Sequence, residues 1–84
     1  MTDVGSRLRA AILTMTDQRA PRTICPSDAA RAVAPDNWRE LMDTTRDLAR
    51  ELARSGDVVI TQKGEVLDPD GEWRGPIRIR RADT

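Results

Sequence analysis

Three features of the 84-residue chain predict a small α+β domain. Apolar residues recur at helical spacing through the first two thirds, a Pro-containing connection at 34–36 separates two helical stretches, and apolar and polar residues alternate in the last third. This length suits one domain, so we expect residues 1–84 to fold as a single unit. Three helices, a short strand between the first two and a C-terminal β-hairpin are the order of a winged helix-turn-helix.

The first helix is predicted over about residues 5–17, where apolar side chains recur every three or four positions. Either Asp3 or Ser6 is suited to be its N-cap, because a short polar side chain can accept a free backbone N–H there. Pro21 disfavours the helical conformation at Ala20, so the helix is expected to end before this pair.

Residues 23–25 form a short run with strand propensity that stops at Pro26. A second, short helix is predicted to follow, with Ser27 as its N-cap. Asp28 would lie in its first turn, where a negative charge is favourable to the helix dipole, and Pro35 would end the helix.

The third helix is predicted to be the longest, capped by Asp36 and ended by Gly56 as the C′ residue. From Trp38 to Ala53, its apolar residues occupy one arc of the helical wheel, which we expect to face the core. A row of arginines flanks this arc and a row of acids lies beyond it, within reach of ion pairs inside the helix. The arginines are Arg39, Arg46, Arg50 and Arg54, and the acids are Glu40, Asp47 and Glu51.

A strand is predicted over 58–61, with Val58 facing inward and Thr61 outward. Lys63 and Gly64 then form a tight turn into the next strand. A second turn is expected at 68–71, because proline presets φ at its second position and glycine accepts a left-handed conformation at its fourth.

The last strand is predicted over 77–80, with its isoleucines facing inward and Arg78 and Arg80 sharing the other face. The predicted core consists of Leu8, Ile12, Met15, Ile24, Val33, Trp38, Leu41, Leu48, Leu52, Val58, Ile60, Ile77 and Ile79.

The composition argues against several classes of protein. Histidine is absent and there is one cysteine, so the chain offers no imidazole base, no internal disulfide and no cysteine-based zinc site. We therefore expect a non-catalytic protein without a cofactor or a metal. The sequence has neither a signal peptide nor a run of about 18 apolar residues, which predicts a cytoplasmic protein without a membrane partner.

Four segments carry a family resemblance. Residues 23–31, 37–42, 61–64 and 75–80 read TICPSDAAR, NWRELM, TQKG and GPIRIR. In this order they resemble a bacterial family of small winged-helix-like domains of unknown function, and the resemblance extends over nearly the whole chain. It implies a fold, but no activity, ligand or functional residue.

A winged helix suggests DNA as the partner, with the third helix in the major groove and the hairpin near the backbone. The candidate contact residues are Asn37, Arg39, Thr44, Arg46, Lys63, Arg74, Arg78 and Arg80. The charge balance weighs against this hypothesis, because 14 basic residues match 14 acidic ones and the segment 36–55 carries more acids than arginines. A protein-interaction module or homodimer without nucleic-acid contact is the alternative.

The basic residues also have a purely structural interpretation. The charges of the third helix would form a solvated face with internal ion pairs. The strand arginines, Arg78 and Arg80, would neutralise acids on an adjacent strand. Those acids are Glu65, Asp68, Asp70 and Glu72.

Three further residues or segments have two interpretations each. Cys25, at the start of the second helix, is either a reactive thiol or a small buried side chain. The acidic segment 68–72 resembles a calcium loop but has Ile79 where the twelfth-position Glu belongs, which favours a simple turn. Trp73 either seals the core or marks a contact surface.

Overall fold

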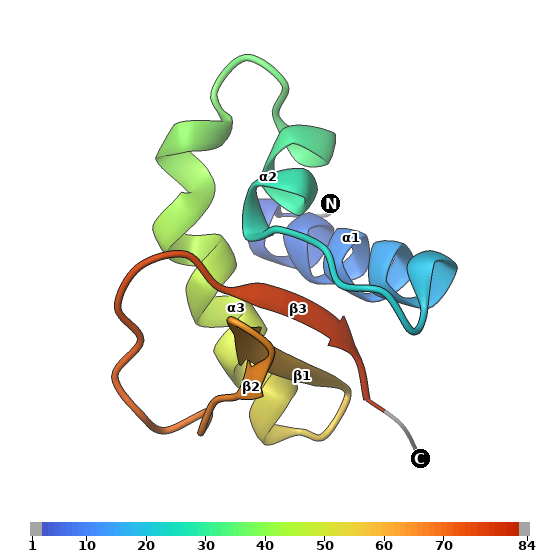
Figure 1. Ribbon diagram of the computed structural model, residues 1–84. Coiled ribbons are helices and arrows are strands. Elements are labelled where there is room, and N and C mark those ends of the chain that lie inside the picture. The colour runs from blue at the N-terminus through green and yellow to red at the C-terminus, as the bar shows by residue number, and fades with distance from the viewer. Residues whose placement is uncertain (1–2, 83–84) are drawn as a thin grey trace.

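The computed structural model describes residues 3–82, so the first two and last two residues of the predicted 1–84 domain lie outside the described part. Its elements are α1 (Val4–Arg19), α2 (Pro26–Val33), the 3₁₀-helix η1 (Trp38–Leu41), α3 (Met42–Arg54), β1 (Val58–Gln62), β2 (Glu65–Val66) and β3 (Arg78–Arg81). The described residues thus form an α+β fold, with three α-helices beside a small antiparallel sheet of strand order β2-β1-β3 (Figure 1).

Helix α1 begins and ends close to the predicted positions. Asp3 is its N-cap, and the Asp3 Oδ1 atom accepts the backbone N–H of Ser6 at 2.7 Å, which settles the choice between the two predicted caps. That hydrogen bond favours the ionised carboxylate and lowers the pKa of Asp3 below its usual value. Ala20 leaves the helical region with ψ of 138°, as expected for the residue before Pro21.

Helix α2 begins two residues earlier than predicted. Cys25 is the N-cap and Pro26 occupies the first helical position, so the prediction of Ser27 as the cap was wrong. Proline suits this first position because its φ is already helical and its missing N–H has no partner there. Asp28 accepts the backbone N–H of Cys25 at 2.9 Å and thereby fixes the start of the helix, while the predicted end before Pro35 is confirmed.

The predicted third helix is divided. Its first turn, η1, is a 3₁₀-helix with Asn37 as N-cap, and α3 begins only at Met42, so Asp36 does not cap the long helix. A 3₁₀-helix has three residues per turn, which takes Trp38 out of line with the apolar arc of α3. Trp38 is half-buried and lies outside the core, contrary to the prediction.

The end of α3 follows the prediction. Gly56 adopts a φ of 83°, which an L-residue with a side chain rarely adopts. Its N–H donates to the carbonyl of Ala53 at 3.1 Å, and the N–H of Asp57 donates to that of Leu52 at 2.9 Å. These two bonds form a Schellman motif, which satisfies carbonyls at the helix end and turns the chain into β1.

The sheet is built around β1. Lys63 and Gly64, both with positive φ, join β1 to β2 in a two-residue turn, as predicted. On its other side β1 pairs with β3, placing Ile60 opposite Ile79. The predicted strand at 23–25 is reduced to a single bridge between Ile24 and Ile79.

Two details of the sheet region differ from the prediction. Thr61 lies opposite Arg78 and therefore faces outward as predicted, but it is buried, because it lies on the central strand between Val66 of β2 and Arg78 of β3. Gly71 does not take a left-handed conformation. The N–H of Gly71 donates to the carbonyl of Asp68 at 3.0 Å, so glycine ends an ordinary turn, and the positive φ occurs instead at Gly75.

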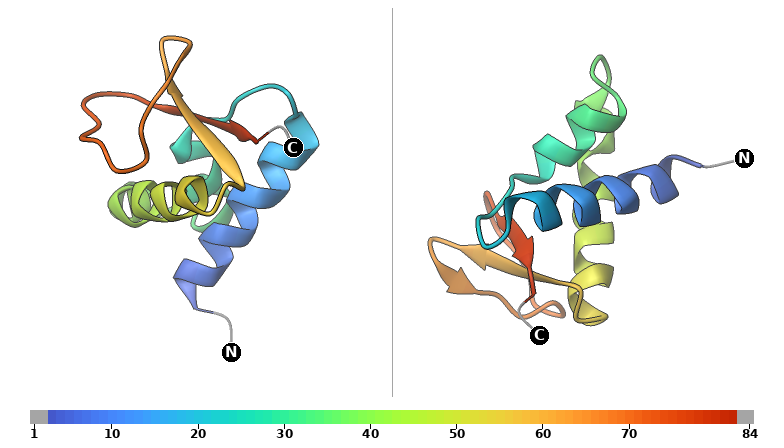
Figure 2. Two further views of the ribbon diagram at one scale, coloured as in Figure 1. Left: turned by 90° about the horizontal axis from the view of Figure 1, so that it is seen from below. Right: turned by 90° about the vertical axis from the view of Figure 1, so that its right-hand side faces the viewer.

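The core lies where the three helices meet the sheet. Helix α1 contacts α2, α3 and β3, α3 contacts β1, and the β1–β2 turn projects away from the helices (Figure 2). The predicted core residues confirmed as buried are Leu8, Ile12, Ile24, Leu52, Val58, Ile60, Ile77 and Ile79. Those that are only half-buried are Met15, Val33, Trp38, Leu41 and Leu48.

Small and polar residues complete the core where the prediction expected larger ones. Ala29, Ala30 and Ala49 are fully buried and allow the helices to approach closely. Thr16 and Thr45 are also buried, and each hydroxyl donates to the backbone carbonyl one helical turn earlier. In the described part of the chain, no helix combines the length and the apolar character needed to cross a membrane.

Candidate nucleic-acid interface

The arginine row of α3 holds the loop between β2 and β3. Arg50 lies 4.0 Å from the centre of the Trp73 ring and donates to the carbonyls of Pro69 and Gly71. One turn earlier, Arg46 donates to the carbonyl of Gly75 at 3.3 Å. Arg46, predicted to contact nucleic acid, is therefore turned toward this loop.

The outer face of α3 is acidic. Asp43, Thr44, Asp47 and Glu51 are all exposed. The expected ion pairs inside this helix do not form in the described residues, since Glu51 pairs instead with Arg9 of α1 at 3.0 Å. Thr44, another predicted contact residue, thus lies among carboxylates that would repel a phosphate backbone.

A different basic cluster lies where α2 meets η1, consisting of Arg31, Trp38 and Arg39. The guanidinium carbons of Arg31 and Arg39 are 4.3 and 4.6 Å from the centre of the Trp38 ring. Both arginines are exposed and have no carboxylate partner in the described structure. Asn37 is exposed and is the N-cap of η1, directly before Trp38 in the chain.

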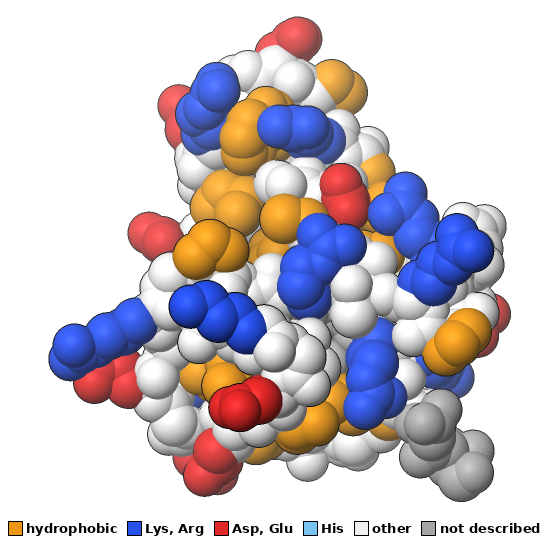
Figure 3. Space-filling view, in the orientation of Figure 1, with side chains coloured by type: hydrophobic (Ala, Val, Ile, Leu, Met, Phe, Trp, Pro, Cys, Tyr) orange, Lys and Arg blue, Asp and Glu red, His pale blue; other side chains and the backbone are white. Residues whose placement is uncertain are grey.

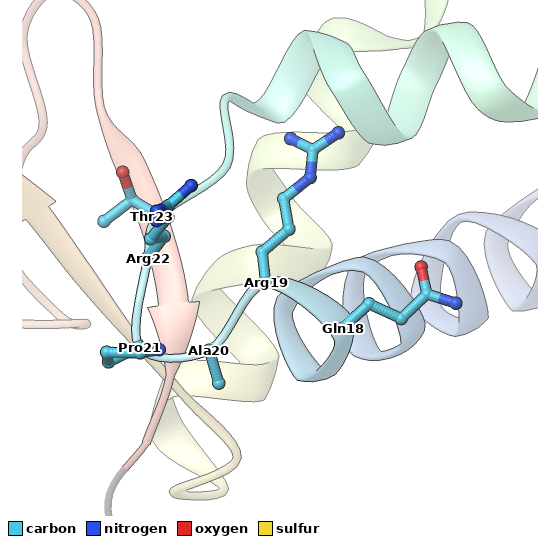
Figure 4. Close-up of a pocket in the computed structure, with 6 residues that line it drawn as sticks. All are labelled: Gln18, Arg19, Ala20, Pro21, Arg22 and Thr23. Carbon is cyan, nitrogen blue, oxygen red and sulfur yellow. The ribbon is translucent and has the colours of Figure 1, made fainter.

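A second basic cluster surrounds a hollow of about 640 Å³ lined by residues 18–23 (Figure 4). Arg19 points toward α2 and pairs with Asp28 at 3.3 Å. Arg22 is exposed, and no ion pair or hydrogen bond engages its side chain within the described residues. From β3, Arg78 reaches the same loop and donates to the Thr23 hydroxyl at 2.9 Å.

The third basic cluster lies at the tip of the hairpin. Lys63 and Arg74 line a hollow of about 430 Å³ between the β1–β2 turn and the β2–β3 loop. Gln62 spans this hollow, donating to the carbonyls of Arg74 and of Pro76. Arg74 is 3.5 Å from Glu72, and both side chains are more than three-quarters exposed, so this ion pair is weak in water.

Arg78 and Arg80 share the outer face of the sheet, as predicted. The strand beside them is β1, which carries no acid, whereas Glu65 lies on β2 across the sheet. Neutralisation by an adjacent acidic strand is therefore not the arrangement found. Arg80 is half-buried and donates to the carbonyl of Arg81 at 3.4 Å.

Seen from the outer side of β3, basic side chains gather on one face of the molecule. Figure 3 shows Lys and Arg side chains over α2, over β3 and over the loops on either side of that strand, with Asp and Glu side chains mostly toward the edge of the view. Arg22 and Arg31 are not among the contact residues that the sequence predicts. Trp38 was expected in the core, because its position in the apolar arc indicated burial.

The remaining candidate features have structural roles. Asp68 accepts the backbone N–H of Asp70 at 2.9 Å, and Asp70 in turn pairs with Arg54 at 2.6 Å, so the segment 68–72 is a turn, as expected.

Within residues 3–82, no group of three or more acidic or cysteine side chains is placed to hold a metal. Trp73 packs against the core, which confirms the sealing role, while Cys25 is half-buried.

Comparison with known families identifies the chain. The family model described as a protein of unknown function (DUF3253) matches residues 5–82, and the chain belongs to this family. A search of the curated proteins gives no match.

Proposed function

We propose that this member of the DUF3253 family is a non-catalytic, winged-helix-like module that binds nucleic acid through its basic face. The observation that supports it is the separation of charge. In a chain with equal numbers of basic and acidic residues, many Lys and Arg side chains lie on the face that Figure 3 shows, while the exposed side of α3 carries Asp43, Asp47 and Glu51.

The separation favours a polyanionic partner for a physical reason. Arginines without a carboxylate partner release counterions when they meet phosphates, which is the main source of non-specific affinity for nucleic acid. Arg22, Arg31, Arg39 and Lys63 have no ion pair in the described residues. The planar guanidinium group also forms two-pronged contacts with phosphate.

The winged-helix assignment is supported by the element order and by the hairpin that projects from the helices. The proposed mode of contact differs from the one the sequence suggested. Since α3 carries Asp43 and Asp47 outward and turns Arg46 inward, we place the contact on α2, η1, β3 and the hairpin tip. Of the predicted residues, this keeps Asn37, Arg39, Lys63, Arg74 and Arg78 at the interface, together with Arg80, and removes Thr44 and Arg46.

Fluorescence anisotropy with labelled oligonucleotides, single-stranded and duplex, tests the proposal across a range of salt concentrations. We expect binding at low salt that weakens steadily as salt rises. Arg22→Ala or Lys63→Ala should each lower the slope of log K against log salt by roughly 0.7–0.9, because one phosphate contact is lost.

The matched control is Arg9→Ala, which removes the same charge beside the acidic helix, where Arg9 pairs with Glu51. This variant should bind like the wild type. Absence of salt-dependent binding to every nucleic acid, or equal losses in Arg9→Ala and Arg22→Ala, would overturn the proposal.

A protein partner is the second candidate, and a different surface favours it. A mostly apolar hollow of about 420 Å³ lies between α1 and α2, lined by Ala10, Ala11, Met15 and Val33 among others. Exposed apolar surface of this kind is common at protein contacts. Sedimentation at several concentrations checks for a homodimer; a Met15→Glu variant that stays monomeric where the wild type dimerises would support this candidate.

A further inference from the structure

We propose that the cluster of Arg31, Trp38 and Arg39 is a stacking site for an unpaired nucleobase, so that the preferred ligand is single-stranded nucleic acid. This inference rests on the proposed function and makes it more specific. It depends on the juxtaposition of two exposed guanidinium groups and one indole ring at the junction of α2 and η1.

The geometry provides flat groups held in place. The ring of Trp38 is half-buried, and each neighbouring guanidinium is held within 4.6 Å of its centre, at the distance of a cation–π contact. The guanidinium group of arginine is planar, so one face can lie on the Trp38 ring while the other face stacks on a base. A nucleobase would continue this stack, while the same arginines neutralise the adjoining phosphates.

The choice of a single strand follows from what a duplex would require. Bases in a duplex are stacked on one another and expose only their edges, so their faces cannot meet an arginine or a tryptophan ring. Reading the edges needs an element that enters a groove, and the long helix α3 offers Asp43 and Asp47 on its exposed side. The basic face instead combines scattered cations with a stacking group, which is the pattern of single-strand binding.

Two pairs of measurements test the inference with the whole chain. The first compares a short mixed-sequence single strand with its duplex and with an abasic strand of equal length, which keeps the phosphates and lacks the bases. We expect the natural strand to bind roughly five-fold or more tightly than the abasic strand, since stacking one base contributes about that factor. The duplex should also bind more weakly than the natural single strand.

The second pair uses substitutions that keep the charge. In Arg31→Lys and Arg39→Lys the cation remains but the planar group is lost, so affinity for the natural strand should fall roughly five-fold while affinity for the abasic strand stays unchanged. Arg9→Lys, on α1 where Arg9 pairs with Glu51 and outside the proposed interface, is the control and should bind both strands like the wild type. The natural strand should also quench the fluorescence of Trp38, identified as the signal lost in Trp38→Phe.

The possible failures are distinguishable. If no nucleic acid binds, the proposed function itself is wrong. If nucleic acid binds but the abasic strand or the duplex binds as tightly as the natural single strand, or if the lysine variants affect both strands equally, the basic face binds phosphates alone and the stacking site is refuted.

Discussion

The guanidinium of Arg50 lies over the ring of Trp73, 4.0 Å from its centre, and joins the long helix to a loop more than fifteen residues further along the chain. The same guanidinium donates to two backbone carbonyls of that loop, and the indole N–H of Trp73 donates to the carbonyl of Asp68 at 2.9 Å. A loop without regular structure is thereby fixed against α3, and with it the approach of β3 to β1.

Arg50→Ala should lower the free energy of unfolding by about 2 kcal/mol, because charge-assisted hydrogen bonds to carbonyls and a cation–π contact are lost together. Chemical denaturation followed by circular dichroism measures the loss. Arg39→Ala serves as the control, because Arg39 is exposed and contacts a ring but no carbonyl. Apart from the loss of this cation–π contact, the substitution should change the free energy of unfolding by less than about 0.5 kcal/mol. Equal stability of Arg50→Ala and the wild type would show that the loop is held by other contacts.

Leu52→Ala should destabilise the fold by about 2–5 kcal/mol, since Leu52 is fully buried between the helices and the sheet and its removal leaves a cavity. Leu48→Ala should cost distinctly less, because Leu48 is half-buried and water can fill part of the space. Thermal and denaturant unfolding of the two variants measures the difference. A larger loss for Leu48→Ala would mean that the arc of α3 is rotated relative to this structure.

Two glycines should respond in opposite directions to alanine. Gly56 has a φ of 83°, so Gly56→Ala is expected to cost about 1 kcal/mol through backbone strain alone, since nothing lies within 4 Å of the added carbon. Gly5 is the second residue of α1, and the added carbon would lie 3.4 Å from Asp3 Oδ1, an ordinary contact. Gly5→Ala should stabilise the chain by up to about 0.5 kcal/mol, because alanine loses less backbone entropy in a helix and the full gain applies only to the helix interior. Differential scanning calorimetry of the two variants checks both signs.

The cap of α1 should be sensitive to acid. The pKa of Asp3 is lowered in the folded chain by the Ser6 N–H, so its contribution to stability is present above the ordinary aspartate pKa of 3.8 and is lost as pH falls through the lowered value. The protection factors of the amide hydrogens in the first turn of α1, each exchange rate compared with the intrinsic rate at the same pH, should therefore fall in this acidic range. In Asp3→Ala these protection factors should already be low at neutral pH, and wild-type protection factors that are equal at neutral pH and below the lowered pKa would contradict the capping role.

Local chemistry explains most of the secondary structure that the sequence predicted. Asp3 accepts the N–H of Ser6, three residues further along the chain, and Pro35 lies two residues after the last residue of α2. The positive φ angles of Lys63 and Gly64 form the hairpin turn. Such features depend on residues close in sequence. The residue pattern therefore contained the information needed for α1, the hairpin turn and the C-terminal end of α3.

The candidate site was harder to predict because charge partners are distant in sequence. Arg46 is in line with Arg39 on a helical wheel, yet Arg46 bonds to the loop at Gly75 while Arg39 rests on Trp38. A wheel assumes one continuous α-helix, and the 3₁₀ turn of η1 breaks that assumption.

The sequence alone determined where α1, α2, the hairpin turn and the C-terminal end of α3 occur and that the isoleucines lie in the core, because periodicity and caps act over a few residues. Tertiary structure decided which arginines hold the fold and which remain available to a ligand. That division depends on whether a carbonyl, a carboxylate or a ring from another part of the chain comes within contact distance, as Asp70 does for Arg54. It also took Trp38 from its expected place in the core and placed it beside two arginines at the surface.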